Sequence, residues 1–403
     1  MKSLLKLGLL TVIAFTLAAH AADEIEITKT FTPGSTPPIK VNISGFTGEV
    51  NDVLNFDLYV MGFINVPADQ AQFLIAGSNN ANVQGTVSDK AVMSVSAGGS
   101  SASRPAGYLR LNKAYSGGSL RRQAHAFADD IALTLTGTKG IAQTKVAFKV
   151  DTGAASEIYI SDFDVFNGSA KAVTHDKTIV AAPTWVPGQL ALYYTSYRLG
   201  NPDIFHHNLS SGARAAFSRY SGLNTSAAVS PDGSRVAMIL SKSGSPEVWV
   251  SNADGSGLKQ LTKTPEDESS PCWSPDGKWI CYATKQGGVR GLYKVPASGG
   301  AAQRIVTRGV SNPSEPDWSP DGKWIVFTAQ MGGFEICVVP AEGGSATVLV
   351  SGEDPSWAPN SRTVIFAKRS GGSRRLSLLD VPTKQVKDAA RISGSNSQPS
   401  WAK

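Results

Sequence analysis

Cysteine, histidine and charged residues are scarce in this chain. Of 403 residues, three are cysteine and five are histidine, and acidic and basic residues together make up 17%. The formal net charge is +6, and basic pairs such as Arg121-Arg122 and Arg374-Arg375 lie far apart without interleaved aromatic residues. Nucleic-acid binding normally needs a clustered basic face. The sequence therefore indicates no nucleic-acid partner.

Short catalytic and metal-binding motifs are also missing. There is no Gly-x-Ser-x-Gly, no His-Glu-x-x-His, no phosphate-cradling glycine loop and no Cys-x-x-Cys. The histidines, which include the pair His206-His207, do not have the spacing of zinc ligands. We therefore expect no catalytic residue, no metal site and no cofactor. A site assembled from segments far apart in the chain would leave no such motif.

Three cysteines permit at most one internal disulfide, and the local candidates are Cys272 and Cys281. A two-residue turn at Asp276-Gly277 would place them directly opposite each other. Pro275 and Gly277 instead favour a type I turn followed by a left-handed bulge residue, which pairs position 274 with 278. The two side chains would then point to opposite faces. We expect three buried, unpaired thiols, with the disulfide as the alternative.

Long apolar runs are absent after the N-terminus. Lys2 and Lys6 precede an apolar run, Leu7 to Ala18, and then Ala19-His20-Ala21. This pattern predicts a cleaved secretory signal over residues 1–21, since the run is shorter than the roughly 20 residues of a spanning helix. We expect an exported protein without a membrane span. The alternative is an N-terminal core helix.

Residues 22–38 read as a mobile N-terminal arm. Charged and β-branched residues alternate in Glu24, Ile25, Glu26 and Ile27, and a stretch rich in proline and glycine follows. An alternating segment that cannot bury its apolar face alone is suited to adding a strand to another sheet. The alternative is a frayed terminus without a role.

The next segment, residues 39–142, predicts a small α/β domain. Lys40 to Gly45 reads as a strand, and Thr47 is placed to cap a helix that Gly62 stops. Strand-like runs follow, the last at Val92 to Val95, before a flexible loop at Gly98 to Ser103. A second helix is capped by Ser119 and ended by Gly137.

A repeat organises residues 143–403. Tryptophan or valine recurs at intervals of 44, 44, 45, 39 and 44 residues, at Trp185, Val229, Trp273, Trp318, Trp357 and Trp401. Ser-Pro-Asp-Gly follows three of these positions directly, at 230–233, 274–277 and 319–322. A repeat of roughly 40 to 45 residues with several short strands is typical of a β-propeller. We interpret the tryptophans as core residues and each aspartate as a turn residue that accepts backbone N–H groups.

The repeat predicts six blades. Five sets of four strands are complete, while Pro399-Ser400-Trp401 supplies a first strand with nothing after it. The segment before Trp185 holds three strands that lack a first, so the C-terminal strand would close a sixth blade and join the ends of the ring. The predicted fold is therefore multidomain, with a small α/β N-terminal domain followed by an all-β six-bladed β-propeller.

This layout resembles the TolB family, the periplasmic component of the Tol-Pal system, over essentially the whole exported chain. The resemblance is strongest at the junction Leu135-Thr136-Gly137-Thr138-Lys139-Gly140-Ile141. It continues through Val146-Ala147-Phe148, the segment Tyr159 to Asp164, and Leu240 to Ser245. The junction directly before a six-blade array is more specific than the turn motif, which many propellers share.

The resemblance implies a monomeric periplasmic adaptor and not an enzyme. Members of the family bind a peptidoglycan-associated lipoprotein, Pal, at the propeller mouth and communicate with TolA, an inner-membrane protein, through the arm, in support of outer-membrane integrity and cell division. The arm residues here are Glu24, Ile25, Glu26 and Ile27. Candidate mouth residues are Leu223, Asn224, Ser270, Glu315, Asp354 and Gln398. Leu223 and Ser270 stand where the family often has His and Glu.

Two other functions remain as alternatives. One is an exported propeller enzyme, such as a polysaccharide lyase or a hydrolase-like protein, and the other is a propeller that binds a different cell-surface ligand. A lyase would need clustered histidine, arginine and metal ligands at one channel mouth, which the few histidines do not favour.

Overall fold

The structure is a computed structural model that describes residues 32–90, 107–166 and 168–403. The predicted signal, the arm residues 24–27, the strand-like run Val92 to Val95 and the loop Gly98 to Ser103 lie outside the described residues. Within the described ranges, no helix is long and apolar enough to cross a membrane.

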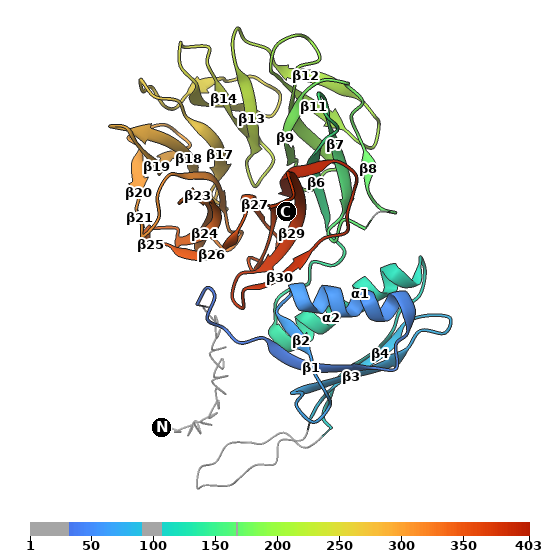
Figure 1. Cartoon of the computed structure of the whole chain (residues 1–403). Helices are drawn as coiled ribbons and strands as arrows, with labels where there is room; N and C mark the ends of the chain where they lie inside the picture. Colours follow the sequence, from blue (N-terminus) through green and yellow to red (C-terminus); the bar gives the residue numbers. More distant parts are fainter. Residues whose placement is uncertain (1–31, 91–106, 167) are drawn as a thin grey trace, which may run out of the picture. The chain divides into compact units, whose positions relative to one another are not determined.

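The N-terminal module is an α/β domain (Figure 1). Its five-stranded sheet has the order β2-β1-β3-β4-β5, with β1 parallel to β2 and β3 and the remaining pairs antiparallel. The strands are β1 (Ile39–Ser44), β2 (Phe63–Asn65), β3 (Phe73–Ser78), β4 (Gln84–Asp89) and β5 (Leu109–Ala114). The helices α1 (Gly48–Val60) and α2 (Leu120–Thr136) pack against each other and bury their apolar stripes.

The two helices begin and end for different reasons. Ser119 Oγ accepts the Arg122 N–H at 3.2 Å, and Gly137 ends α2 in the left-handed conformation, as predicted. The prediction for Thr47 is wrong in part, because Thr47 is the N-cap residue of α1 but makes no side-chain cap. Its backbone N–H instead donates to Asn79 Oδ1 at 3.0 Å, which ties the helix start to the sheet.

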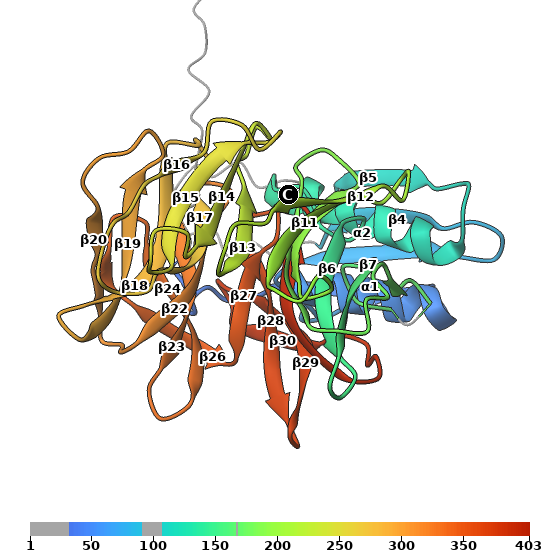
Figure 2. The same cartoon turned by 90° about the horizontal axis from the view of Figure 1, so that it is seen from above.

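Six four-stranded sheets form the predicted propeller (Figures 1 and 2). The first blade contains β9 (Val180–Trp185), β10 (Ala191–Ser196), β11 (Asp203–Asn208) and β12 (Arg214–Ser218); the second β13 (Asn224–Val229), β14 (Arg235–Leu240), β15 (Glu247–Asn252) and β16 (Lys259–Gln260); the third β17 (Ser269–Trp273), β18 (Trp279–Gln286), β19 (Val289–Pro296) and β20 (Gln303–Ile305). The fourth contains β22 (Pro313–Trp318), β23 (Trp324–Gln330), β24 (Phe334–Pro340) and β26 (Thr347–Ser351); the fifth β27 (Glu353–Trp357), β28 (Thr363–Ser370), β29 (Ser373–Asp380) and β30 (Gln385–Asp388). A two-stranded pair, β21 (Thr307–Arg308) and β25 (Gly344–Ser345), links the third and fourth blades.

The sixth blade joins the two ends of the array, as predicted. Its sheet has the order β31-β6-β7-β8, so the C-terminal strand β31 (Ser395–Trp401) pairs with β6 (Lys145–Asp151), followed by β7 (Ser156–Asp162) and β8 (Lys171–Ala172). Trp401 is 2% exposed, and its indole N–H donates to Thr144 Oγ1 at 2.8 Å. Closure removes the exposed end that an open array of blades would present to another sheet.

The Ser-Pro-Asp-Gly segments are the turns between the first and second strands of three blades. In the second blade, Asp232 Oδ1 accepts the Ser234 N–H at 3.1 Å, and Ser230 Oγ accepts the Arg235 N–H at 2.9 Å. Asp276 and Asp321 accept backbone N–H groups in the same way. The predicted role of these aspartates as turn residues is therefore confirmed.

The register predicted for the two cysteines is wrong. Cys272 pairs directly with Cys281, because the turn holds four residues and closes between Ser274 and Trp279. Gly277 has a left-handed backbone, as predicted. However, Ser274 Oγ accepts a hydrogen bond from the Trp279 N–H at 2.9 Å, so Lys278 lies inside the turn and not in the ladder. All three thiols are buried, as expected.

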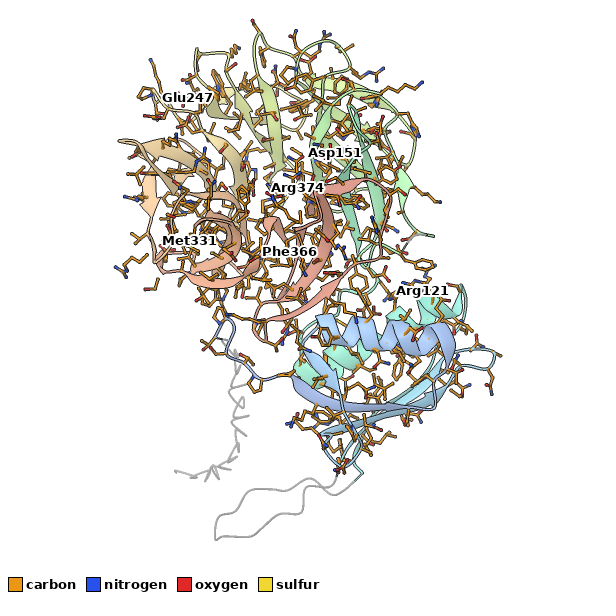
Figure 3. All side chains as sticks on the ribbon, in the orientation of Figure 1. Arg121, Asp151, Glu247, Met331, Phe366 and Arg374 are labelled. Atoms are coloured by element: carbon orange, nitrogen blue, oxygen red, sulfur yellow. The ribbon has the colours of Figure 1, made fainter. Side chains whose placement is uncertain are left out.

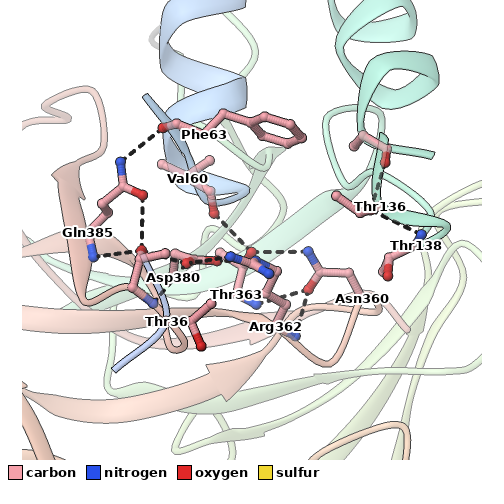
Figure 4. A network of polar contacts seen from close by, with 12 residues as sticks. Thr36, Val60, Phe63, Thr136, Thr138, Asn360, Arg362, Thr363, Asp380 and Gln385 are labelled. Carbon is pink, nitrogen blue, oxygen red and sulfur yellow. Dashed lines mark hydrogen bonds and ion pairs between the residues drawn. The ribbon is translucent and has the colours of Figure 1, made fainter. Parts of the chain in front are cut away.

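The α/β module and the propeller share one hydrophobic core at the fifth and sixth blades. Thr363 Oγ1 donates to the Val60 carbonyl at 3.0 Å, and Gln385 Nε2 donates to the Phe63 carbonyl at 2.9 Å (Figure 4). Both propeller residues begin the strands that follow turns of the fifth blade. The module is therefore attached at the end of the strands where the Ser-Pro-Asp-Gly turns lie, called here the turn end.

Candidate partner-binding channel

One residue in the inner strand of every blade has a left-handed backbone. These residues are Ala182, Ser226, Ser270, Glu315, Asp354 and Gln398, with φ between +49° and +55°. Each stands three positions before the repeating tryptophan or valine, and five of them precede a proline. Non-glycine residues rarely adopt this conformation, and a following proline restricts the backbone further. The propeller thus carries the same local strain six times around its axis.

A β-bulge produces this geometry. In the third blade the ladder passes from the pair Ser269 and Ala283 to the pair Cys272 and Cys281, so the inner strand has one residue more than its partner. Pro271 lies inside the bulge, where its missing N–H interrupts no ladder hydrogen bond. Register shifts occur at the matching place in the other five inner strands.

Three of the left-handed residues connect neighbouring blades. Glu315 Oε2 accepts the Asp354 N–H at 3.0 Å, Asp354 Oδ2 accepts the Gln398 N–H at 3.0 Å, and Gln398 Oε1 accepts the Ala182 N–H at 2.9 Å. The chain of bonds runs through the fourth, fifth, sixth and first blades. These side chains therefore hold the inner ring together as well as lining it.

The tryptophans reinforce the same ring. The indole N–H of Trp273 donates to the Ala228 carbonyl at 2.8 Å, and that of Trp357 donates to the Asp317 carbonyl at 3.2 Å. Each carbonyl belongs to the inner strand of the preceding blade. The tryptophans are core residues, as predicted, and they also position one blade against the next.

The inner strands surround a cavity of about 520 Å³. All six left-handed residues contribute to its lining, together with prolines and tryptophans of the same strands and the prolines of the Ser-Pro-Asp-Gly turns. Lys403 also lines it, and its ammonium group is 2.7 Å from Asp317 Oδ1. The cavity therefore has rigid apolar walls and a few polar groups, as binding pockets commonly do.

The polar groups in this cavity are acidic on one side. Burial raises the pKa of Asp354 to about 7, and the neighbouring Glu315 carboxylate adds to the increase. Thr328 Oγ1 donates to Glu315 at 2.6 Å. Each carboxylate accepts a backbone N–H with one oxygen, so the pair serves the packing of the ring even though a raised pKa is common in active sites.

The predicted mouth residues divide into two groups. Ser270, Glu315, Asp354 and Gln398 line the cavity together. Asn224 does not: it is fully buried, and its side chain bonds Ser218 and the backbone of the loop that precedes β13. Leu223 packs against the core between the second and third blades. Ala182 and Ser226 also line the cavity but were not predicted from the sequence. Their position, three residues before the repeating tryptophan or valine, is the signal that could have identified them.

Exposed apolar side chains lie at the other end of the inner strands, called here the entry end. They extend from the turns between second and third strands and from the loops that lead into β9 and β13. Met331, at the turn between β23 and β24, is one of them (Figure 3). The set is Ile179, Tyr197, Leu199, Tyr220, Val289 and Met331, with exposed fractions of 36% to 59%. Apolar side chains gathered at one end of a molecule indicate an interaction surface.

A family model of the TolB beta propeller domain matches residues 133–403. The chain belongs to the TolB family. Its curated relatives include the Tol-Pal system protein TolB of Bordetella pertussis, which is 30% identical over 184 residues, and that of Anaeromyxobacter dehalogenans strain 2CP-1, which is 31% identical over 157 residues. These matches cover 45% and 39% of this chain and 42% and 36% of the relatives. The chain thus matches about two fifths of the length of these relatives.

Solved structures support the same fold. TolB from Acinetobacter baumannii superposes with a TM-score of 0.78 at 21% identity, over 93% of this chain and 98% of that one. A putative TolB from Agrobacterium tumefaciens gives a TM-score of 0.51 at 21% identity, over 64% of this chain and 92% of that one. The TolB fold, with its α/β module and six blades, therefore also includes the residues of this chain that lie outside its sequence matches to the curated relatives.

Proposed function

We propose that this TolB-family chain is a periplasmic adaptor of a Tol-Pal-like system. It binds a Pal-like lipoprotein at the entry end of the propeller and a TolA-like inner-membrane protein through its N-terminal arm. The observation that carries the proposal is the asymmetry of the propeller. The turn end holds the α/β module, while the entry end presents exposed apolar side chains.

The entry end has the composition expected of a surface that binds a protein. Tyr220 is 36% exposed, and the Lys242 ammonium group lies 3.9 Å from the centre of its ring. Met331 and the aromatic residues supply large apolar contacts, which are enriched where proteins bind each other. A cation beside a tyrosine favours a partner with acidic groups around an apolar centre.

The arm enters the described structure close to the propeller. The Gly34 N–H donates to the Val381 carbonyl at 2.9 Å, and the Thr36 N–H donates to the Pro382 carbonyl at 3.0 Å. Residues 34–36 are therefore held on the fifth blade, before β1 begins at Ile39. This anchor supports an arm that starts from a defined point at the turn end, away from the surface proposed for the lipoprotein.

A structural role also accounts for the acidic residues of the cavity better than catalysis does. The carboxylates of Glu315 and Asp354 are already used to accept N–H groups of neighbouring blades. Within the described ranges, no group of three or more His, Cys, Asp or Glu residues could hold a metal ion. We therefore propose a non-enzymatic protein that acts through its two surfaces.

Affinity capture from envelope extracts tests the two surfaces separately. We compare the chain from residue 22 with a chain that begins at residue 39, and with Met331→Asp and Val289→Asp at the entry end. We expect removal of the arm to abolish capture of a TolA-like protein alone, and the two aspartate variants to reduce capture of a Pal-like lipoprotein alone. Leu190→Asp is the matched control, since Leu190 is 44% exposed at the turn end. Unchanged lipoprotein capture by both entry-end variants would contradict the proposed surface.

A further inference from the structure

Two of the three cysteines lie directly opposite each other in the third blade. Cys272 is in the inner strand β17 and Cys281 is in the adjacent antiparallel strand β18, in register. Residues opposite each other in an antiparallel ladder project from the same face of the sheet. Both side chains accordingly belong to the core cluster that includes Trp318 and Phe327 of the fourth blade.

The geometry of such a pair matches what a disulfide needs. Opposed residues in an antiparallel ladder have Cα atoms about 4.5 or 5.5 Å apart, and disulfides span Cα separations of about 4.4 to 6.8 Å. The two thiols are close enough to hydrogen bond, and this contact, together with burial, holds the pKa of Cys272 well above its usual value. The register alone therefore places the pair within the range of Cα separations that a disulfide spans.

The two thiols differ in access. Cys281 is fully buried, whereas Cys272 lines the central cavity and is 8% exposed. The third cysteine, Cys337, is buried in β24 opposite Phe327 and Val348. Its pKa is raised to about 12 by burial and by Glu335. Only Cys272 and Cys281 are therefore placed for a bond within one hairpin.

We propose that Cys272 and Cys281 form a cross-strand disulfide when the chain folds in the presence of a disulfide oxidant. The thiolate of one cysteine attacks a sulfur of the oxidant and releases one thiolate of the oxidant. The thiolate of the other cysteine then attacks the mixed disulfide, forms the Cys272–Cys281 bond and releases the second thiolate. The cysteines lose two protons and two electrons, and one oxidant disulfide becomes two thiols. Because burial and the Cys281 thiol hold the pKa of Cys272 well above its usual value in the folded blade, the bond forms before the hairpin is fully packed.

Refolding in a redox buffer tests the geometry. The reduced, denatured chain is refolded with oxidised and reduced glutathione. Free thiols are then alkylated in denaturant, and the mass of the intact protein is measured. We expect one alkylated cysteine, Cys337, and two more after reduction. Trypsin cleavage after Lys263, Lys278 and Lys285 would leave peptides 264–278 and 279–285 joined through the two cysteines. Three alkylated cysteines, or a bond that includes Cys337, would overturn the proposal.

Two variants control this measurement. Cys337→Ser should keep the bond and show no alkylation before reduction, whereas Cys272→Ser should leave both remaining thiols alkylated. The melting temperature of the oxidised protein should exceed that of the reduced protein by roughly 5 °C, and Cys272→Ser should lack this difference.

A second experiment uses protein made in cells and rests on the export that we propose above. The chain with residues 1–21 is compared with a chain that lacks them, and both are alkylated at harvest. Export to an oxidising compartment predicts one reactive cysteine in the first chain and three in the second. If refolding forms the bond and the first chain still has three reactive cysteines, the disulfide stands and the proposed export is contradicted.

Discussion

The carboxyl groups of Glu247 and Glu268 are buried side by side between the second and third blades. Thr264 links them, because its backbone N–H donates to Glu247 at 2.7 Å and its hydroxyl donates to Glu268 at 2.9 Å. Burial, and the hydrogen bond that protonated Glu268 donates to Glu247, raise the pKa of Glu268 to about 8. Glu268 is therefore a neutral acid in the folded protein at pH 7.

This pair predicts that the free energy of unfolding falls as the pH rises from about 4.5 to about 8. The unfolded chain releases the Glu268 proton near its ordinary pKa of about 4.5, whereas the folded chain keeps it until about pH 8. The stabilising effect is fully present below pH 4.5 and is lost as the pH rises through 8. We expect Glu268→Gln to be more stable than the wild type at pH 9 by roughly 2 kcal/mol, measured by urea unfolding.

The control for this variant is Asp267→Asn, which neutralises the exposed neighbouring carboxylate. It should follow the wild-type dependence of unfolding free energy on pH between 5 and 9. Parallel curves for Glu268→Gln and the wild type would show that the two carboxyl groups do not share a proton.

Closure of the ring predicts a large effect at the C-terminus. Trp401 is buried in β31, and its indole N–H donates to Thr144. Trp401→Ala should lower the free energy of unfolding by roughly 3–5 kcal/mol, because it leaves a cavity and removes this bond. Deletion of residues 399–403 should lower the melting temperature further, since the inner strand of the sixth blade then loses Pro399 to Trp401. Leu190→Ala is the exposed control, and a deletion variant that melts like the wild type would contradict the role of β31.

The repeated left-handed residues predict an unusual gain from glycine. Ala182 has φ of +49°, a conformation that glycine adopts without strain. Ala182→Gly should therefore raise the free energy of unfolding by about 0.5–1 kcal/mol. Ala181→Gly, one residue earlier in β9 and outside the left-handed region, should lower it by a similar amount. Equal effects of the two variants would argue against strain in the ring.

The repeat made much of this fold predictable from the sequence. The period of the tryptophans predicted the six blades and the closing strand, and Asp232 and its equivalents were predicted as turn residues because proline and glycine flank them. These features depend on local chemistry that recurs. The resemblance at Leu135 to Ile141 added the family, which no single blade would have shown.

The errors arose where one side chain competes with a backbone group. The Ser274 hydroxyl accepts the Trp279 N–H, which a tighter turn would have bonded within the ladder. Cys272 therefore pairs with Cys281, one position away from the partner that the predicted turn would have given it. The backbone N–H of Thr47, at the start of α1, donates to Asn79, which is 32 residues away in the sequence. Asn224, a predicted mouth residue, begins β13, and its buried side chain bonds Ser218 and the backbone of the loop before that strand. Such choices depend on neighbours that are distant in the sequence or that form only in the folded blade.

The anchor of the arm gives the last prediction. Gly34 has φ of +71°, and a Cβ atom there would lie 2.3 Å from Lys384 Cε. Gly34→Ala should therefore weaken the contacts of Gly34 and Thr36 with the fifth blade by about 1 kcal/mol, from backbone strain and displacement of the lysine. We expect hydrogen exchange of the residue 34 and Thr36 amides to accelerate about fivefold, while exchange in the blades is unchanged. Gly117→Ala is the matched control, because Gly117 has φ of +79° with no atom within 4 Å of the added Cβ. If Gly117→Ala accelerated exchange at Thr36 as much as Gly34→Ala does, the effect would be general destabilisation and not release of the anchor.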